Sequence, residues 1–381
     1  MKNYYIPQSL DQQIDDLLNR IAESLQLDET RRAAAERSYR AVSDWISSDV
    51  GFFKEVPFDI YPQGSFRVGT TVRPYSGSEF DLDIVIHMAA RYAGFDPMKT
   101  LNELERRLRE NGTYNSMVER KNRCIRLNYA NEFHMDILPG FHESIYDHNR
   151  LMVPDRALKD WTASNPKGYA HWLESKFIRQ DLILLEKARS VEELPENMPY
   201  QLKQPLQRAV QLIKRYRDVY FQDKPELATS SIILTTLAGM FYGGQTSEYQ
   251  AIKAIVNGIN GAVPLLKGKV IEIVNPANTD EKFSDKWDNE PELYDAFVVF
   301  IRDFKKVWDQ LHYTSGIHKV IDIIKPAFGD AVSTTALREQ VDFIEKARSS
   351  GRLGVVRNSG LLTGAAGHGI SQIKRNNFYG S

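Results

Sequence analysis

A turn followed by a strand with two aspartates constrains this chain more than any other stretch. The predicted strand covers residues 80–87, in which Asp81 and Asp83 stand two residues apart. Residues two apart on a strand point to the same face, so the two carboxylates share one face and the apolar residues line the other. Two carboxylates held together repel each other unless a cation lies between them, and Mg²⁺ prefers such oxygen ligands. The stretch therefore predicts a strand that carries a divalent-cation site.

The turn in front of this strand is suited to phosphate. Gly64 lets the main chain turn and approach a ligand closely. Ser65 adds a hydroxyl, and Arg67 adds a forked cation that matches phosphate oxygens. Together with Gln63, which precedes the glycine, these residues are our candidates for nucleotide binding.

A third carboxylate completes the pattern. Residues 133–138 alternate as a strand, and Asp136 lies on its polar face. An aspartate on a strand, taken alone, is more often a solvated polar position. Three aspartates behind a Gly-Ser turn instead indicate a two-metal phosphoryl-transfer site, where one ion activates an attacking hydroxyl and the other steadies the triphosphate.

The composition excludes several other classes of protein. The 381 residues carry 49 Lys and Arg against 50 Asp and Glu, which is less basic than a protein that coats nucleic acid. One cysteine allows neither an internal disulfide nor a cysteine zinc cluster, and it fits a reducing compartment. The first residues lack a signal-peptide core, and the most apolar run, 232–242, is shorter than the ~20 residues of a membrane span. We expect a cytoplasmic protein with no membrane partner.

The hydrophobic periodicity predicts an α+β protein in three parts. Helices are expected at 9–27, 28–46 and 97–111, and a hairpin joins 123–129 to the strand of Asp136. From residue 201 the chain reads as helical. We therefore predict a catalytic lobe over 1–200 with a mixed sheet and N-terminal helices, a helical lobe over 201–348, and a glycine-rich tail over 349–381 that is loop or flexible.

The Gly-Ser turn, the Asp-x-Asp strand and the later aspartate resemble those of the polymerase-β-like nucleotidyltransferases. Within that superfamily the chain is similar to the CD-NTases, the bacterial relatives of cyclic GMP-AMP synthase in the anti-phage systems called CBASS. Residues 164–172 and 274–287 resemble further family segments, and the resemblance covers nearly the whole chain. It implies a polymerase-β-like lobe with a helical second lobe of the OAS/cGAS type. In the first segment Tyr169 and Trp172 are expected to pack in the core, with stacking on a base as the alternative.

The resemblance also points to residues of the second lobe. It implies that Lys214 reaches the triphosphate, although a Lys-Arg run is otherwise a solvated helix face. It implies that Ser230 and Ser231 bind phosphate or ribose. Hydroxyls and N–H groups at a helix N-terminus suit an anion, while plain N-capping explains the same serines.

Taken together, the resemblance implies an enzyme that joins ribonucleoside triphosphates, ATP or GTP among them, into a cyclic di- or trinucleotide. Asp81, Asp83 and Asp136 would hold two Mg²⁺ ions, with Mn²⁺ as a substitute. The product would be a second messenger that activates an effector protein. Ancillary CBASS proteins would act on the C-terminus, whose end at 376–381 resembles tails of some family members. The His/Cys cluster of the DNA-sensing animal enzyme is missing, so activation by DNA is not expected.

Two other functions use the same residues. The site could extend an RNA 3′ end or transfer a nucleotide to a protein, but the sequence lacks a basic, aromatic stretch for RNA, and small protein-modifying transferases lack a second lobe. A non-catalytic nucleotide sensor would be expected to have lost one of the acidic positions, and all three are occupied. The sequence leaves open the bases, the linkage and the activating signal.

Overall fold

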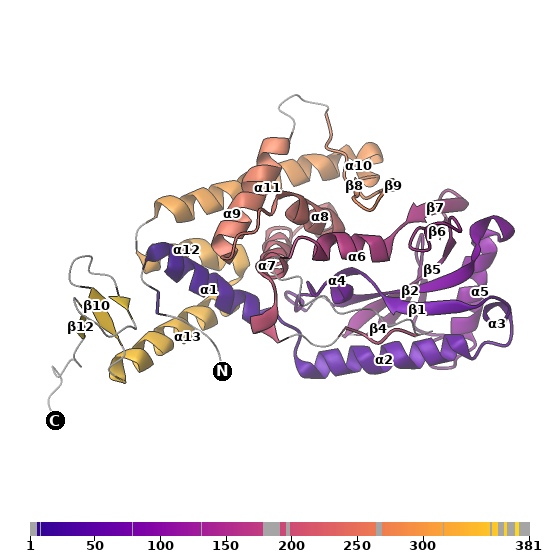
Figure 1. Cartoon of the computed structure of the whole chain (residues 1–381), viewed down its shortest axis with the longest axis horizontal. Helices are drawn as coiled ribbons and strands as arrows, with labels where there is room; N and C mark the ends of the chain where they lie inside the picture. The colour runs from indigo at the N-terminus through magenta and orange to yellow at the C-terminus, as the bar shows by residue number, and fades with distance from the viewer. Residues whose placement is uncertain are drawn as a thin grey trace.

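The chain folds into two lobes, a sheet-containing lobe and a helical one (Figure 1). This architecture comes from a computed structural model. It describes residues 6–7, 9–77, 79–130, 132–177, 191–195, 199–263, 269–314, 316–350, 353–356, 362–363 and 370–372. The end of the predicted tail, beyond residue 372, lies outside these residues.

A mixed, seven-stranded sheet forms the catalytic lobe. Its strands are β1 (Phe58–Pro62), β2 (Phe80–Arg91), β3 (Val118–Arg120), β4 (Ile125–Tyr129), β5 (Phe133–His142), β6 (Leu151–Asp155) and β7 (Asp160–Ser164). The main path runs β1-β2-β5-β4-β3, and β6 extends from β5 to β7. Among these seven strands of the described residues, β2 and β5 pair in parallel and the other pairs are antiparallel, including the predicted hairpin of β4 and β5.

The alternation along β2 places its apolar residues inside, as predicted. Leu82, Ile84 and Ile86 are fully buried, while Asp81 on the opposite face is exposed. Helix α2 (Glu29–Ser47) covers the apolar face of the sheet with Ala35, and with further residues on the same side of the helix. Figure 1 shows α2 running along the sheet. Helices α3 (Phe52–Glu55), α4 (Gly64–Arg67) and α5 (Pro97–Arg109) complete this lobe.

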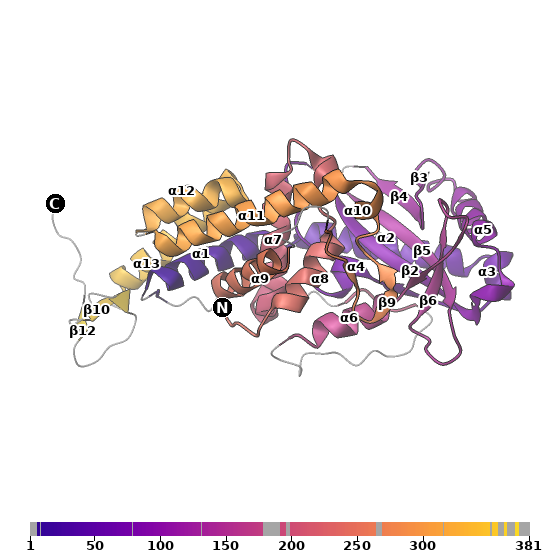
Figure 2. The ribbon, with the colours of Figure 1, turned by 90° about the horizontal axis from the view of Figure 1, so that it is seen from above.

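Helices build the second lobe. They are α1 (Leu10–Ser24), α6 (Pro166–Glu174), α7 (Pro205–Tyr220), α8 (Ser231–Phe241), α9 (Glu248–Ala262), α10 (Lys286–Asn289), α11 (Pro291–Tyr313), α12 (Ile317–Phe328) and α13 (Asp330–Ser349). A short hairpin of β8 (Val274–Asn275) and β9 (Asn278–Lys282) lies beside β7 of the catalytic sheet. Figure 2 shows α1, α11, α12 and α13 stacked side by side, away from the sheet.

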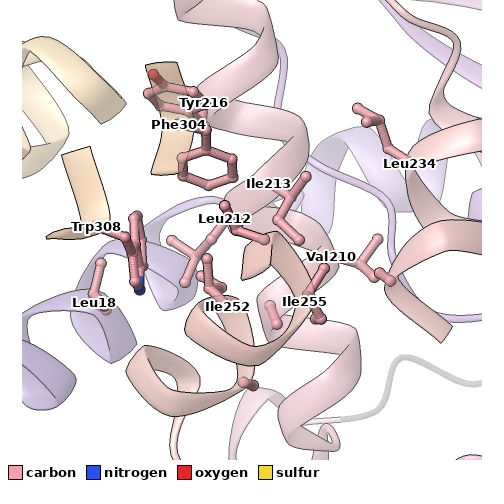
Figure 3. Packing of buried hydrophobic residues seen from close by; sticks show 14 of the residues in the cluster. Leu18, Val210, Leu212, Ile213, Tyr216, Leu234, Ile252, Ile255, Phe304 and Trp308 are labelled. Carbon is pink, nitrogen blue, oxygen red and sulfur yellow. The ribbon is translucent and has the colours of Figure 1, made fainter. Parts of the chain in front are cut away.

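Helix α1 lies in a different lobe from the one that we predicted. It begins where we predicted but ends at Ser24, three residues before the predicted end, and Ser9 caps it by accepting a hydrogen bond from the Gln12 N–H. Its apolar face, however, packs in the core of the helical lobe, where Leu18 lies beside Trp308 of α11 (Figure 3) and shares a cluster with Ile252 of α9. Amphipathic spacing shows that a helix buries one face but does not say against which partner. The chain therefore starts in the helical lobe and crosses to the sheet through α2.

The tail also departs from the prediction of loop. Three short strands, β10 (Gly354–Val356), β11 (Leu362–Thr363) and β12 (Ile370–Gln372), form a small antiparallel sheet beyond α13. Strands this short carry too few residues for alternation to be recognised in the sequence. In the part of the chain that the structure describes, no helix combines the length and apolar character needed to cross a membrane.

Candidate active site

Strand register brings the three aspartates together. Asp83 of β2 lies directly opposite Asp136 of β5 in the parallel pair. Asp81 lies two residues earlier on β2, opposite His134. Pairing in this register puts all three carboxylates on the same face of the sheet. His134 does not join them, because its Nε2 lies 2.9 Å from Glu79. The structure thus assembles the carboxylate set that the sequence predicted.

An arginine that the sequence analysis overlooked lies among these carboxylates. Arg126 of β4 is the register partner of Asp136. Its Nε and Nη2 donate to the two oxygens of Asp136 at 2.7 and 2.8 Å, and Nη2 also reaches Asp81 at 3.3 Å. The guanidinium therefore neutralises part of the acidic cluster in the metal-free protein.

Burial and repulsion act strongly on the remaining carboxylate. Burial, reinforced by the charges of Asp81 and Asp136, raises the pKa of Asp83 to about 8. The pKa of Asp81 is also raised, chiefly by partial desolvation among the neighbouring groups, although its side chain is still exposed and Arg126 opposes the shift. Because these neighbouring carboxylates are hard to ionise together, a bound cation would stabilise their charged forms strongly.

The Gly-Ser turn forms a single helical turn, α4, beside these residues. Gly64 begins it with φ +60°, and a Cβ built there would lie 2.3 Å from Oδ2 of Asp83. No side chain fits such an approach, so the glycine is required both by its conformation and by its neighbour. The Ser65 hydroxyl accepts a hydrogen bond from Thr71 Oγ1 at 3.1 Å and faces the cleft.

The predicted residues of the helical lobe face the carboxylates from α7 and α8. Lys214 is buried, and its Nζ donates to the carbonyl and hydroxyl oxygens of Thr70, both at 3.2 Å. Burial lowers the pKa of Lys214 to about 8. Ser231 also lines the cleft, and its Oγ accepts from Arg217 at 2.8 Å. Ser230 is the exposed N-cap residue of α8 and lies outside the cleft lining.

The other two predicted nucleotide-binding residues, Gln63 and Arg67, lie in different parts of the structure. Gln63 lines the cleft on the side of Asp136. Arg67 forms an ion pair with Glu174 of α6 and lines neither part of the cleft. In this structure Arg67 joins α4 to the helical lobe instead of facing a phosphate site.

The cleft between the lobes has two parts that meet at Asp83. The larger cavity, of about 760 Å³, extends from the carboxylates past Ser65, Lys214 and Ser231. The smaller cavity, of about 300 Å³, lies on the side of Asp136. Gly64, Asp83 and Tyr169 line both, and the volumes fall in the range of small-molecule sites. Tyr169 is buried as expected, with its hydroxyl 3.1 Å from Thr236, yet its ring also borders both cavities.

Comparison with known proteins decides the family. The sequence model of the Second Messenger Oligonucleotide or Dinucleotide Synthetase domain matches residues 12–176. A c-di-GMP synthase of Roseivirga ehrenbergii is 39% identical over 369 residues, which cover 97% of each chain. The chain belongs to the CD-NTase family. It is a nucleotidyltransferase, a cyclic dinucleotide synthase.

Other CD-NTases share the fold at lower identity. The cyclic dinucleotide synthase CdnG of Bradyrhizobium diazoefficiens is 26% identical over 383 residues, covering 93% of this chain and 89% of CdnG. The structure of CdnG in complex with GTP superposes with a TM-score of 0.70 at 23% identity, over 86% of this chain and 98% of CdnG. The cyclic AMP-GMP synthase DncV of Vibrio cholerae has a TM-score of 0.52 at 16% identity, over 84% and 88%. These similarities confirm the predicted α+β fold with a helical second lobe.

The carboxylates of this CD-NTase suit a hard divalent cation, because all three supply oxygen ligands. Across the described residues, no three His, Cys, Asp or Glu side chains are grouped as a complete metal site. Arg126 donates to both Asp136 and Asp81. The donor set, made only of carboxylate oxygens, fits Mg²⁺ or Mn²⁺.

Proposed function

We propose that this CD-NTase joins two GTP molecules into cyclic di-GMP, with release of two pyrophosphates. The 39% identical relative is a c-di-GMP synthase, and CdnG has been solved with GTP. The structural observation that carries the proposal is the pair of cavities that meet at Asp83. One nucleotide on each side of the carboxylates is the arrangement that joining two nucleotides requires.

The reaction follows from that arrangement. A ribose hydroxyl of the acceptor in the smaller cavity attacks the α-phosphorus of the donor in the larger one. The new phosphorus–oxygen bond forms as the bond to the bridging oxygen of the β-phosphate breaks, and pyrophosphate leaves with the electron pair while the hydroxyl proton is released. The linear product keeps the triphosphate of the acceptor nucleotide and the free ribose hydroxyls of the donor nucleotide. Attack of one of these hydroxyls on the remaining α-phosphorus, with loss of the second pyrophosphate, closes the ring.

The chain's own residues hold the reactants. Lys214, Ser65 and Ser231 surround the space for the donor triphosphate and supply a cation and two hydroxyl donors. Asp81, Asp83 and Asp136 would hold two Mg²⁺ ions, with Mn²⁺ as a substitute. When bound, these ions would lower the pKa of the attacking hydroxyl and offset the charge of the leaving pyrophosphate. The assignment of Gln63 and Gly64 to the nucleotide stays part of this proposal.

The proposal extends to the cellular role. We infer a cytoplasmic enzyme of a bacterial anti-phage system, whose product activates an effector protein. The C-terminal end, which ancillary proteins of such systems would modify, lies outside the described residues.

The test is an incubation of the purified protein with Mg²⁺ and each ribonucleoside triphosphate, singly and in pairs, followed by phosphatase treatment and mass spectrometry. We expect GTP alone to give a phosphatase-resistant product with the mass of cyclic di-GMP. A product that requires ATP, or label that stays on added RNA or protein, would overturn the proposal.

A further inference from the structure

The main chain that follows the Gly-Ser turn is held by side chains of the helical lobe. Segment 68–73 leaves α4 and runs along α7, and four of its residues line the larger cavity. Five of its six carbonyl oxygens accept hydrogen bonds from one row of donors. The pairs are Gln207 Nε2 to Val68 (2.9 Å), Lys203 Nζ to Gly69 (2.9 Å), Lys214 Nζ to Thr70 (3.2 Å), Gln211 Nε2 to Thr71 (2.6 Å) and Arg215 Nη2 to Arg73 (2.7 Å).

These five donors, which we call the donor stripe, occupy one side of α7 and the residue two positions before it. Lys203, Gln207 and Gln211 follow one another at intervals of four residues, and Lys214 and Arg215 lie three and four residues beyond Gln211, which is the spacing of neighbours on a helix face. Gln207, Gln211, Lys214 and Arg215 are buried, with at most 6% of each residue exposed. A buried donor without a partner is costly, so the helix and the segment are held to each other in a specific register.

The backbone conformation of segment 68–73 and contacts at its far end also favour its position against α7. Gly69 has φ +69°, and a Cβ at this position would lie 2.5 Å from Nε2 of Gln207. The Arg73 N–H donates to the Leu25 carbonyl at 2.7 Å, which fixes the far end of the segment to the residue after α1. Gln26 also reaches the Oε1 of Gln211, at 3.0 Å.

The segment in turn holds a residue of the proposed phosphate site. Thr71, whose carbonyl accepts from Gln211, donates its own hydroxyl proton to Ser65 Oγ at 3.1 Å. The Thr70 N–H donates to the Ser65 carbonyl at 2.9 Å. The position of Ser65 therefore depends on hydrogen bonds that begin on the helical lobe.

We propose that Gln207 and Gln211 are positioning residues for nucleotidyl transfer, which set Ser65 and the Gly-Ser turn by holding the main chain of segment 68–73. This inference rests on the proposed function for its effect on rate. The donors bind backbone carbonyls, so the contact depends on the presence of an N–H donor at each position and not on the side chains of the segment.

Isosteric variants isolate that donor. Gln211→Glu removes the Nε2 donor to Thr71 while keeping an oxygen for Gln26, and Gln207→Glu keeps the oxygen that caps the Gln204 N–H at 2.8 Å. Gln211→Lys restores a donor of the kind that Lys203 and Lys214 already provide. Gln245→Glu, in the loop before α9, is the matched control, since its oxygen still accepts from Gly243.

We expect kcat with GTP to fall about 10- to 100-fold in Gln211→Glu and Gln207→Glu, because an error of about 1 Å in a reacting group has that cost. Gln211→Lys should recover most of the rate, and Gln245→Glu should match the wild type. Hydrogen–deuterium exchange of the ligand-free protein gives a readout that does not depend on turnover. Peptides covering 62–75 should exchange faster in the two Glu variants only.

Each result decides the inference. Unchanged exchange in both Glu variants would overturn it, as would faster exchange with kcat within twofold of the wild type. Failure of Gln211→Lys to recover the rate would mean that packing, and not the donor, is required, which also overturns it. If the wild type itself makes no product, the proposed function fails, and the exchange measurement alone decides whether the donor stripe holds the segment.

Discussion

Asp83 of β2 faces Asp136 of β5 across the one parallel strand pair of the sheet, and Arg126 bonds to the second of these carboxylates but not to the first. The three aspartates are therefore not equivalent. Asp136 is paired with a guanidinium, whereas Asp83 is half-buried against Gly64 with its pKa raised to about 8.

Asp83 makes the stability of the metal-free protein depend on pH. Its pKa in the folded state lies above the unfolded value of about 3.9, so the folded state binds more protons between these two values. The free energy of unfolding therefore falls as pH rises from about 4 to about 8. We expect Asp83→Asn to be more stable than the wild type in EDTA at pH 8, by on the order of a few kcal/mol, and the difference to shrink toward pH 5.

Urea denaturation at several pH values measures this effect. Asp59→Asn, an exposed position on β1, should show no such trend. An Asp83→Asn variant that is less stable than the wild type at pH 8 would contradict the conclusion that the pKa of Asp83 is raised in the folded protein.

Arg126 competes with cations for the acidic cluster. Replacing it by glutamine leaves Asp136 and Asp81 without their guanidinium partner, and a charge-assisted bond of this kind contributes about 1.5–3 kcal/mol. Arg126→Gln should therefore bind Mn²⁺ roughly tenfold more tightly in the absence of nucleotide. Electron paramagnetic resonance of free Mn²⁺ gives the affinity. The control is Arg120→Gln on β3 of the same sheet, since the Arg120 guanidinium pairs with Glu105 of α5 and not with the aspartates. Equal or weaker Mn²⁺ binding by Arg126→Gln would show that the guanidinium does not compete.

Gly64 is required because the Asp83 carboxylate lies against it, and also because its backbone has a positive φ. Gly64→Ala would push a Cβ against the Asp83 carboxylate, so we expect kcat to fall by about 100-fold or more. Gly77 supplies a matched control, because it also has a positive φ, +79°, but has open space around its Cβ position. Gly77→Ala should lose about 1–2 kcal/mol of stability from backbone strain and keep its rate per folded molecule. Similar rates for the two variants would mean that the Gly64–Asp83 contact does not matter for catalysis.

Glu281 of β9 ties the lobes together on the side of the smaller cavity. Its carboxylate accepts from Ser164 Oγ, from the Asn165 N–H and from Asn275 Nδ2, at 2.6–3.0 Å. Glu281→Ala leaves these donors without their acceptor, which should lower the free energy of unfolding by about 2 kcal/mol and raise the KM for GTP. Denaturant unfolding and initial rates check both effects. Glu272→Ala, at an exposed glutamate, should change neither, and a Glu281→Ala variant that behaves in the same way would refute the link.

The sequence predicted the acidic cluster because strand alternation and the Gly-Ser turn are local patterns. It also contained a signal for Arg126 that went unused. The predicted hairpin brings residues 125 and 126 alongside Asp136, and the observed pairing of Tyr129 with Phe133 is what selects Arg126. The Arg67–Glu174 pair and the partner of α1 depend on tertiary packing, which local periodicity does not encode. The donor stripe binds main-chain carbonyls, which every residue carries, so no side-chain pattern in segment 68–73 could reveal its acceptors.

If the three aspartates make a cyclic dinucleotide from GTP, Asp136→Asn should stop the reaction without preventing GTP binding. The measurement is the amount of cyclic di-GMP formed over time by the wild type and by this variant, with the Kd for GTP determined for each protein. We predict that the wild type accumulates cyclic di-GMP while the variant is slower by at least about 10³-fold, with a Kd for GTP within a few-fold of the wild type. Comparable product formation by Asp136→Asn, or a wild type that binds GTP but forms no cyclic product, would contradict the account.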